Sequence, residues 1–109
     1  MTEEVLLQLF ILQLIDKHSL LDNQYGLTRF FAKSAILPRE LYDTLNCLEH
    51  EELIRGKEVR STVKYYFVTD KGKEMLAEKY SIPILKEYLH DIERTDFFIT
   101  ILEKIEKRY

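Results

Sequence analysis

Cys47 and His50 are the two residues in this chain best placed by type and spacing to hold a metal. On a helix, a spacing of three residues brings them to one face, where a thiolate and an imidazole could supply two of the four ligands of a zinc site. His18 and His90 are far away in sequence, and Cys47 is the single cysteine, which also excludes an internal disulfide. We therefore predict an ordinary surface pair, with no metal and no cofactor.

Catalysis has equally little support in the sequence. The acidic neighbours Asp43, Glu49 and Glu51 are expected to raise the pKa of Cys47, which argues against a reactive thiolate or a redox sensor. With 3 glycines in the chain there is no glycine-rich phosphate loop, and no serine or cysteine has a recognisable base partner. We predict that the protein is not an enzyme.

A different set of polar residues suits contacts with DNA. Arg39, Tyr42 and Asn46 fall on the polar side of a helix predicted over residues 38–51. Arginine and asparagine can each make two hydrogen bonds to a base edge, and tyrosine can meet a phosphate or a thymine methyl group. A β-ribbon predicted over residues 54–68 adds cations for phosphates and hydroxyl groups at its tip. These ribbon residues are Arg55, Lys57, Arg60, Ser61, Thr62 and Lys64.

The elements that must position these side chains are mostly helices. The 109 residues can form one core, and 3 Gly and 2 Pro leave few tight turns, which argues against a fold of many short strands. A first helix, capped by Thr2 and extending to about His18, is apolar around almost its whole circumference. Both of its sides need cover, so part of it is expected to contact a second subunit.

Two short helices are expected to meet across the connection from Ser34 to Leu37, which is the pattern of a helix-turn-helix. The first covers about residues 26–33. The second begins at Pro38, because proline is tolerated in the first turn of a helix. Its apolar side is formed by Leu41, Leu45 and Leu48, and after the ribbon Thr69 or Asp70 is expected to cap a helix over residues 71–80.

Three helices followed by a two-stranded ribbon and a helix are the organisation of a winged helix-turn-helix domain. In such a domain, the stretch LYDTLNCLEHEELI would form the recognition helix and the start of the wing, and KYYFVTDKGKEML would form the end of the wing. These two motifs resemble the PadR group of transcriptional regulators, with the MarR group as second choice. Glu52 stands where the family usually has glycine, which predicts a helix end without a left-handed cap. The matching residues are Leu41, Tyr42, Leu45, Leu48, Glu49, Leu53, Ile54, Tyr65, Tyr66, Thr69 and Gly72.

The distribution of charge favours DNA binding more than the net charge of -3 does. Residues 28–73 hold nine basic and seven acidic side chains, so the acidity of the chain lies outside the predicted binding region. Glu40 and Asp43 lie beside Arg39 on the recognition helix and are expected to repel phosphates.

A last helix over residues 83–109 carries an apolar stripe at spacings of three and four. At 1.5 Å per residue it would be roughly 40 Å long, more than a domain of this size can cover. We predict a mainly α fold with a small β-ribbon: a winged helix-turn-helix domain over residues 1–82, and a dimerisation helix over residues 83–109 that packs with the first helix. The predicted homodimer, which the resemblance also implies, uses Leu85, Tyr88, Leu89, Ile92, Phe98, Ile99, Leu102 and Ile105.

The predicted partners are double-stranded DNA, a second copy of the chain and an unidentified small-molecule effector. The apolar run at residues 5–15 has no basic segment before it and is too short to cross a bilayer, so we expect a soluble cytoplasmic protein with no membrane partner. The alternative is a winged helix that binds protein, for instance in a replication or conjugation assembly. Binding to duplex DNA as salt is varied would separate the two.

Overall fold

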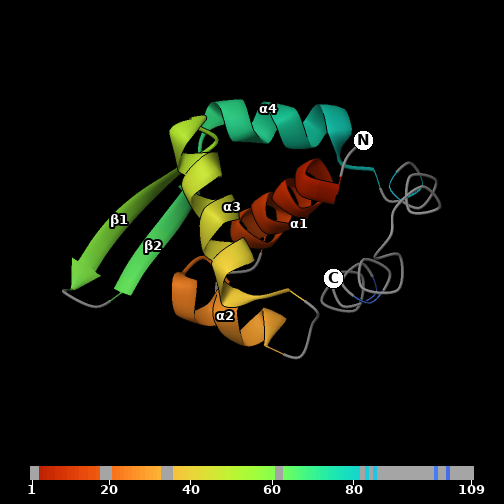
Figure 1. Cartoon of the computed structure of the whole chain (residues 1–109). Helices are drawn as coiled ribbons and strands as arrows, with labels where there is room; N and C mark the ends of the chain where they lie inside the picture. Colours follow the sequence, from red (N-terminus) through yellow and green to blue (C-terminus); the bar gives the residue numbers. More distant parts are fainter. Residues whose placement is uncertain are drawn as a thin grey trace.

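The computed structural model describes residues 3–17, 21–32, 36–60 and 63–81 and positions 83, 85, 100 and 103, with the backbone alone at 59, 60 and 63 (Figure 1). These residues form a mainly helical structure with a small antiparallel ribbon, which confirms the predicted α+β class. None of the helices in this part of the chain combines the length and apolar character that crossing a bilayer requires. The elements are α1 (Glu3–Lys17), α2 (Gln24–Phe31), α3 (Pro38–His50), β1 (Ile54–Arg60), β2 (Val63–Val68) and α4 (Asp70–Lys79).

Helix α1 forms the centre of the structure and packs against α3, α4 and β2 (Figure 1). Every residue from Leu6 to Leu12 is buried, including Gln8. Each large apolar side chain buried in this way contributes about 2 kcal/mol of transfer free energy. The chain itself therefore covers this all-round apolar helix, so the helix does not need a second subunit to shield it from water.

Helix α2 begins two residues earlier than predicted. The side chain of Asn23 caps it, because its Oδ1 atom accepts a hydrogen bond of 2.7 Å from the backbone N–H of Gly26. Leu27, Phe30 and Phe31 are buried, as predicted. Residues 33–35, which include the first half of the predicted turn, lie outside the described residues.

Helix α3 begins at Pro38, as predicted, but its end corrects the prediction made for Glu52. This residue has a φ of 62°, so the helix does end in a left-handed cap, formed without glycine. The N–H of Leu53 donates to the carbonyl of Leu48 at 2.9 Å, and the N–H of Glu52 donates to Glu49 at 3.0 Å. This is the Schellman arrangement, whose two hydrogen bonds hold Glu52 in a backbone conformation that residues other than glycine rarely adopt.

The two strands of the ribbon pair in antiparallel register, with Gly56 opposite Tyr66 and an irregularity between Glu58 and Arg60. Tyr66 is buried in the core, which places alternate residues on two faces. The second edge of β2 is also occupied, since the N–H of Tyr66 donates to Asp22 at 2.7 Å. The inner face, toward the core, holds Ile54, Gly56, Glu58, Lys64, Tyr66 and Val68, and the outer face holds Arg55, Lys57, Tyr65 and Phe67.

Helix α4 is capped by Thr69, one of the two predicted caps, whose hydroxyl oxygen accepts from the N–H of Gly72 at 3.1 Å. Gly72 lies against the corner where α3 leads into β1. A methyl group there would collide with the carbonyl oxygen of Leu53 and lie 2.7 Å from Val68 Cγ1. The hydroxyl of Thr69 also donates to the carbonyl of Glu52 at 2.6 Å, so α4 fastens this corner from outside.

Most of the predicted C-terminal helix lies outside the described residues, including all of its predicted dimerisation residues except Leu85. Leu85 is completely buried in the core of the single chain. In this structure its side chain is therefore not exposed to a partner.

Candidate nucleic-acid interface

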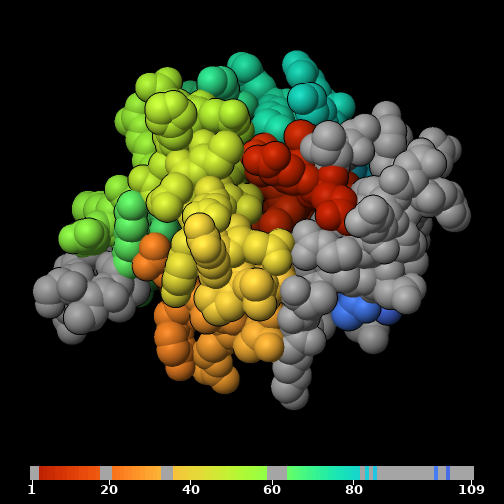
Figure 2. Space-filling model, viewed as in Figure 1, coloured from red at the N-terminus to blue at the C-terminus, as the bar shows by residue number. Residues whose placement is uncertain are grey.

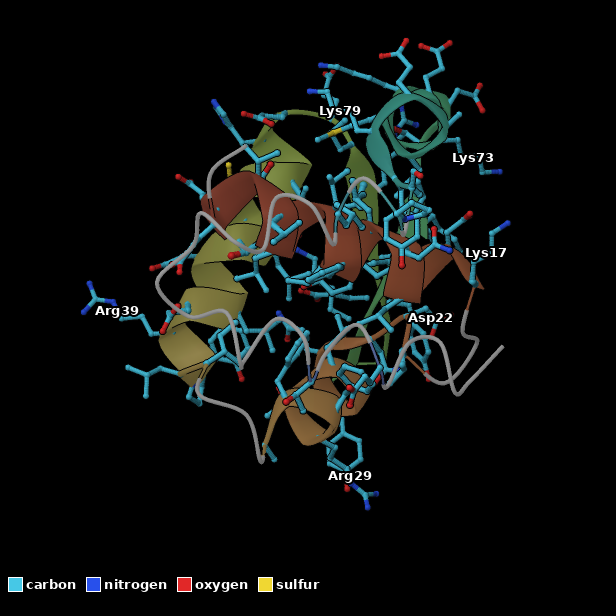
Figure 3. All side chains as sticks on the ribbon, turned by 90° about the vertical axis from the view of Figure 1, so that its right-hand side faces the viewer. Lys17, Asp22, Arg29, Arg39, Lys73 and Lys79 are labelled. Carbon is cyan, nitrogen blue, oxygen red and sulfur yellow. The ribbon has the colours of Figure 1, made fainter. Side chains whose placement is uncertain are left out.

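Helix α3 lies at the surface on one side of the molecule, which Figure 2 shows from the front, and its exposed side carries polar side chains. Arg39, Tyr42 and Asn46 are all exposed, as predicted. Figure 3 shows Arg39 pointing away from the body of the protein. The opposite side of α3 is fixed in the core by Leu41, Leu45 and Leu48, each at most 1% exposed. The exposed side chains therefore project from a helix whose own position is determined by packing.

The two acidic residues beside Arg39 behave differently from one another. Asp43 lies 3.9 Å from Nε of Arg39, and both side chains are largely exposed, so the pair is weak and open to solvent. Glu40 is half-buried, and its carboxylate accepts a hydrogen bond of 3.5 Å from the N–H of Leu37. Because Leu37 has no side-chain acceptor, Glu40 helps to satisfy the start of the helix. Asp43 therefore remains as the largely exposed acid beside Arg39.

Lys64 was predicted to contact phosphate, but in the structure its charge is neutralised within the protein. Its Nζ atom lies 2.6 Å from Oε1 of Glu49 on α3, and both side chains are less than one third exposed. This hydrogen bond is the main reason that the pKa of Lys64 is raised above its ordinary value. We therefore leave Lys64 out of the proposed DNA contacts.

Lys64 belongs to a polar connection between three elements. Its Nζ lies 5.6 Å from the centre of the Tyr66 ring, and the Tyr66 hydroxyl accepts a hydrogen bond of 2.9 Å from Nε2 of Gln24 on α2. Burial raises the pKa of Tyr66, which keeps the phenol neutral. Gly56 leaves the space through which the end of the Lys64 side chain passes. We name Glu49, Lys64, Tyr66 and Gln24 the clamp, because together they join α3 to the ribbon and α2.

Sequence reasoning did not identify the clamp. Glu49 and Lys64 are 15 residues apart, and their proximity depends on the packing of α3 against the ribbon. The opposite charges were visible in the sequence, but nothing there paired these two in preference to other acids and bases.

The predicted cations Arg55 and Lys57 are exposed on the outer face of the ribbon, on the side away from α3. The backbone of Arg60 pairs with Val63 at the far end of the ribbon. The side chain of Arg60, together with Ser61 and Thr62, lies outside the described residues, so the roles of the tip remain predictions.

Cys47 is half-buried between α1 and α3, where the amide nitrogen of Gln8 lies 3.5 Å from its sulfur. The pKa of Cys47 is raised, chiefly by burial and also by Glu51 and Glu4. The expected direction is therefore confirmed, but burial is its first cause. The thiol lines an open groove of about 530 Å³ between α1, α3 and α4. In the described part of the chain, no group of three histidine, cysteine or acidic side chains could hold a metal ion.

Comparison of the chain with protein-family models, with curated proteins and with solved structures gives no match.

Proposed function

We propose that the protein is a PadR-like winged helix-turn-helix regulator that binds specific double-stranded DNA as a homodimer. The observation that carries the proposal is the polar face of α3, with Arg39, Tyr42 and Asn46 exposed along a helix that is fixed from behind and followed by a basic ribbon. Such a helix fits the major groove of B-DNA, where side chains of these types can reach base edges.

The proposal divides the contacts between the two elements. Arg39 and Asn46 are seven residues apart, almost two helical turns, so they lie on the same line of α3, and we assign them to base edges. Arg55, Lys57 and Arg60 in the ribbon are assigned to phosphates, with the hydroxyl groups of Ser61 and Thr62 at the tip. Phosphate contacts supply attraction without sequence information, so affinity is expected to depend on the ribbon and preference on α3.

A homodimer would present two copies of α3 to a pseudo-palindromic site and would multiply the modest affinity of one subunit. The apolar stripe predicted in residues 83–109 supports it. Occupancy of an operator would then block or reposition polymerase. A small-molecule effector remains part of the proposal without an assigned site.

The first test measures binding to mixed-sequence duplex DNA by fluorescence anisotropy as salt is varied. We expect affinity to fall steeply with salt, with a logarithmic slope of about -0.9 for each phosphate contacted. Lys57→Ala and Arg60→Ala should each weaken binding to all sequences and reduce the slope by about 1. Absence of binding even at low salt would overturn the proposal.

The second part of the test concerns preference. After selection of bound sites from random duplexes, Arg39→Ala should cost about 1–3 kcal/mol on the selected site and relax the preference at one base pair. Arg29→Ala is the matched control, because Arg29 is also an exposed arginine but lies on α2 over the ring of Tyr25. Unchanged preference in both Arg39→Ala and Asn46→Ala would remove their assignment to bases.

A second function, binding to another protein, is favoured by one observation. Leu37 is 63% exposed at the start of α3 and Tyr42 is 42% exposed five residues later, so the exposed surface of α3 also offers apolar area. If duplex binding is absent, we expect Leu37→Ser to weaken capture of a protein partner of a nucleoprotein assembly.

A further inference from the structure

The outer face of the ribbon combines aromatic rings and cations in a regular arrangement. Arg55 lies directly across the ribbon from Phe67, and Lys57 lies across from Tyr65. Directly opposed residues of an antiparallel pair have their Cβ atoms about 5 Å apart. Each ring is therefore accompanied by its own cation, and the second pair repeats the first two residues further along.

These side chains are open to solvent. Phe67 is 54% exposed, Arg55 and Lys57 are exposed, and Tyr65 is half-buried. A single exposed ring is ordinary on a protein surface, but here a second ring, Tyr65, lies two residues away on the same face, and each ring has a cation opposite it. The acid of the ribbon, Glu58, lies on the inner face and leaves this one positive.

We propose that the outer face of the ribbon binds single-stranded nucleic acid, with unpaired bases stacking on Phe67 and Tyr65 and phosphates meeting Arg55 and Lys57. Every base has a flat π face, so rings interleaved with cations hold an unpaired strand largely without regard to sequence. The two pairs repeat at about 6.6 Å along the strand. A duplex, whose bases are stacked at about 3.4 Å, could not give its base faces to rings spaced in this way.

The rings of this surface are separate from the proposed base-reading face of α3, although Arg55 and Lys57 also belong to the proposed duplex contacts. The inner face of the same ribbon is joined to α3 by the ion pair between Lys64 and Glu49. The outer face is therefore turned away from α3, and Figure 1 shows the ribbon extending from the helical body. Because Arg55 and Lys57 are used by both ligands, a duplex and an unpaired strand are expected to compete for these two cations, whereas Phe67 and Tyr65 serve the unpaired strand alone.

The test measures anisotropy of a labelled single strand of about 12 nucleotides at low salt, with the matching duplex measured in parallel. Phe67→Ala should weaken single-strand binding by roughly tenfold, because one stacking surface is lost. Phe67→Tyr, which keeps the ring, should stay within about twofold of the original, whereas Phe67→Leu should fall with Phe67→Ala even though it keeps apolar area. Duplex affinity should not change in any of the three.

Tyr25 provides the matched control. It is 67% exposed on α2 and has Arg29 over its ring at 5.7 Å, so it offers the same pair of groups on a helix and not on the ribbon. Tyr25→Ala should leave single-strand binding unchanged. The paired variant Arg55→Gln with Lys57→Gln should lower single-strand affinity and its dependence on salt without removing a ring.

Three results would overturn this inference: no single-strand binding at low salt, equal losses for Tyr25→Ala and Phe67→Ala, or full binding in Phe67→Leu. Binding of a labelled peptide of alternating glutamate and leucine, in place of the single strand, would assign the face to an acidic protein partner instead. Failure of the duplex proposal is recognised separately. Arg39→Ala should leave single-strand binding intact, and Phe67→Ala should leave duplex binding intact.

Discussion

Helix α3 and the ribbon differ in charge although both belong to the proposed duplex interface. Helix α3 carries one arginine against three acids, whereas the two strands carry four basic residues against one acid. A phosphate backbone is attracted mainly by charge, while base edges are read by a small number of well-placed hydrogen bonds. In the proposed duplex complex, the ribbon would therefore supply attraction and α3 would supply selection of sequence. The net charge of the whole chain averages the two regions and hides this division.

Two groups of contacts hold α3 and the ribbon in a fixed arrangement. The corner from α3 into β1 is fastened by Thr69 and Gly72, and the clamp joins the ribbon to α3 through Glu49, near the C-terminal end of the helix. The corner is made of backbone groups with little freedom. The clamp is made of side chains that can move. Substitutions in the corner should therefore change the free energy of unfolding more than substitutions in the clamp.

Gly72→Ala is expected to have the largest effect. The added methyl group would meet the carbonyl oxygen of Leu53 and a methyl group of Val68, both in packed surroundings. Overpacking of this kind costs about 1–3 kcal/mol in the free energy of unfolding, which urea denaturation would measure. Gly56→Ala is the control, because there the new methyl group meets the flexible end of Lys64. A larger loss of stability in Gly56→Ala than in Gly72→Ala would contradict the contrast between a rigid corner and a clamp of flexible side chains.

Glu52→Gly acts on the same corner and should stabilise the protein. Glu52 has a φ of 62°, a conformation that costs a non-glycine residue about 1 kcal/mol and costs glycine almost nothing. Part of this gain is offset because glycine is more flexible in the unfolded chain. We expect the free energy of unfolding to rise by about 0.5–1 kcal/mol, measured by urea denaturation. Glu51→Gly, one residue earlier at a negative φ, should destabilise the protein instead. A decrease in stability for Glu52→Gly would show that its side chain has a role beyond the cap.

Local signals in the sequence predicted most of the framework. Pro38 marked the start of α3, and the alternation after Ile54 marked a ribbon whose strands form as predicted. Features that depend on distant contacts were not predictable. The left-handed conformation of Glu52 results from hydrogen bonds of the completed helix end, and a rule based on glycine alone gave the wrong answer.

The proposed site divides in the same way. The exposure of Arg39, Tyr42 and Asn46 followed from helical periodicity, because the leucines of α3 determine which side is buried. The position of Lys64 did not follow, since alternation along a strand gives two faces without saying which one meets a helix. Its neutralisation by Glu49 required the packing of two elements that the sequence places 15 residues apart.

Asp43→Asn tests the difference in charge between α3 and the ribbon by removing an acid from α3. Asp43 is largely exposed beside Arg39, and its charge opposes the approach of a phosphate backbone. Its removal should raise duplex affinity by about two- to threefold at low salt, and the gain should shrink as salt screens the interaction. Anisotropy titrations at several salt concentrations would measure this. Asp70→Asn, an exposed acid at the start of α4, is the control and should change affinity less. An unchanged affinity in Asp43→Asn would mean that this face of α3 does not approach phosphates.

The smallest expected effect concerns the clamp and depends on pH. The pKa of Lys64 is raised above 10.5 in the folded protein, first by its hydrogen bond to Glu49, so folding favours the protonated amine. The stability that this adds is complete below the unfolded pKa and is lost as pH rises through the folded pKa. Because both side chains are nearly one third exposed, we expect the ion pair to contribute only about 0.5 kcal/mol.

The measurement compares the free energy of unfolding of the original protein and of Glu49→Gln at about pH 8 and about pH 11. The advantage of the original protein should be present at the lower pH and should shrink at the higher pH. Cys47 also has a raised pKa, but Glu49 is not among its causes, so its titration cancels in the comparison. Glu49 is one of the smaller causes of the raised pKa of Tyr66, whose titration therefore cancels in part. Lys57→Gln, on the outer face, should show no such dependence. An advantage that persists undiminished at high pH would mean that Glu49 stabilises the junction by packing, and that charge does not join α3 to the ribbon.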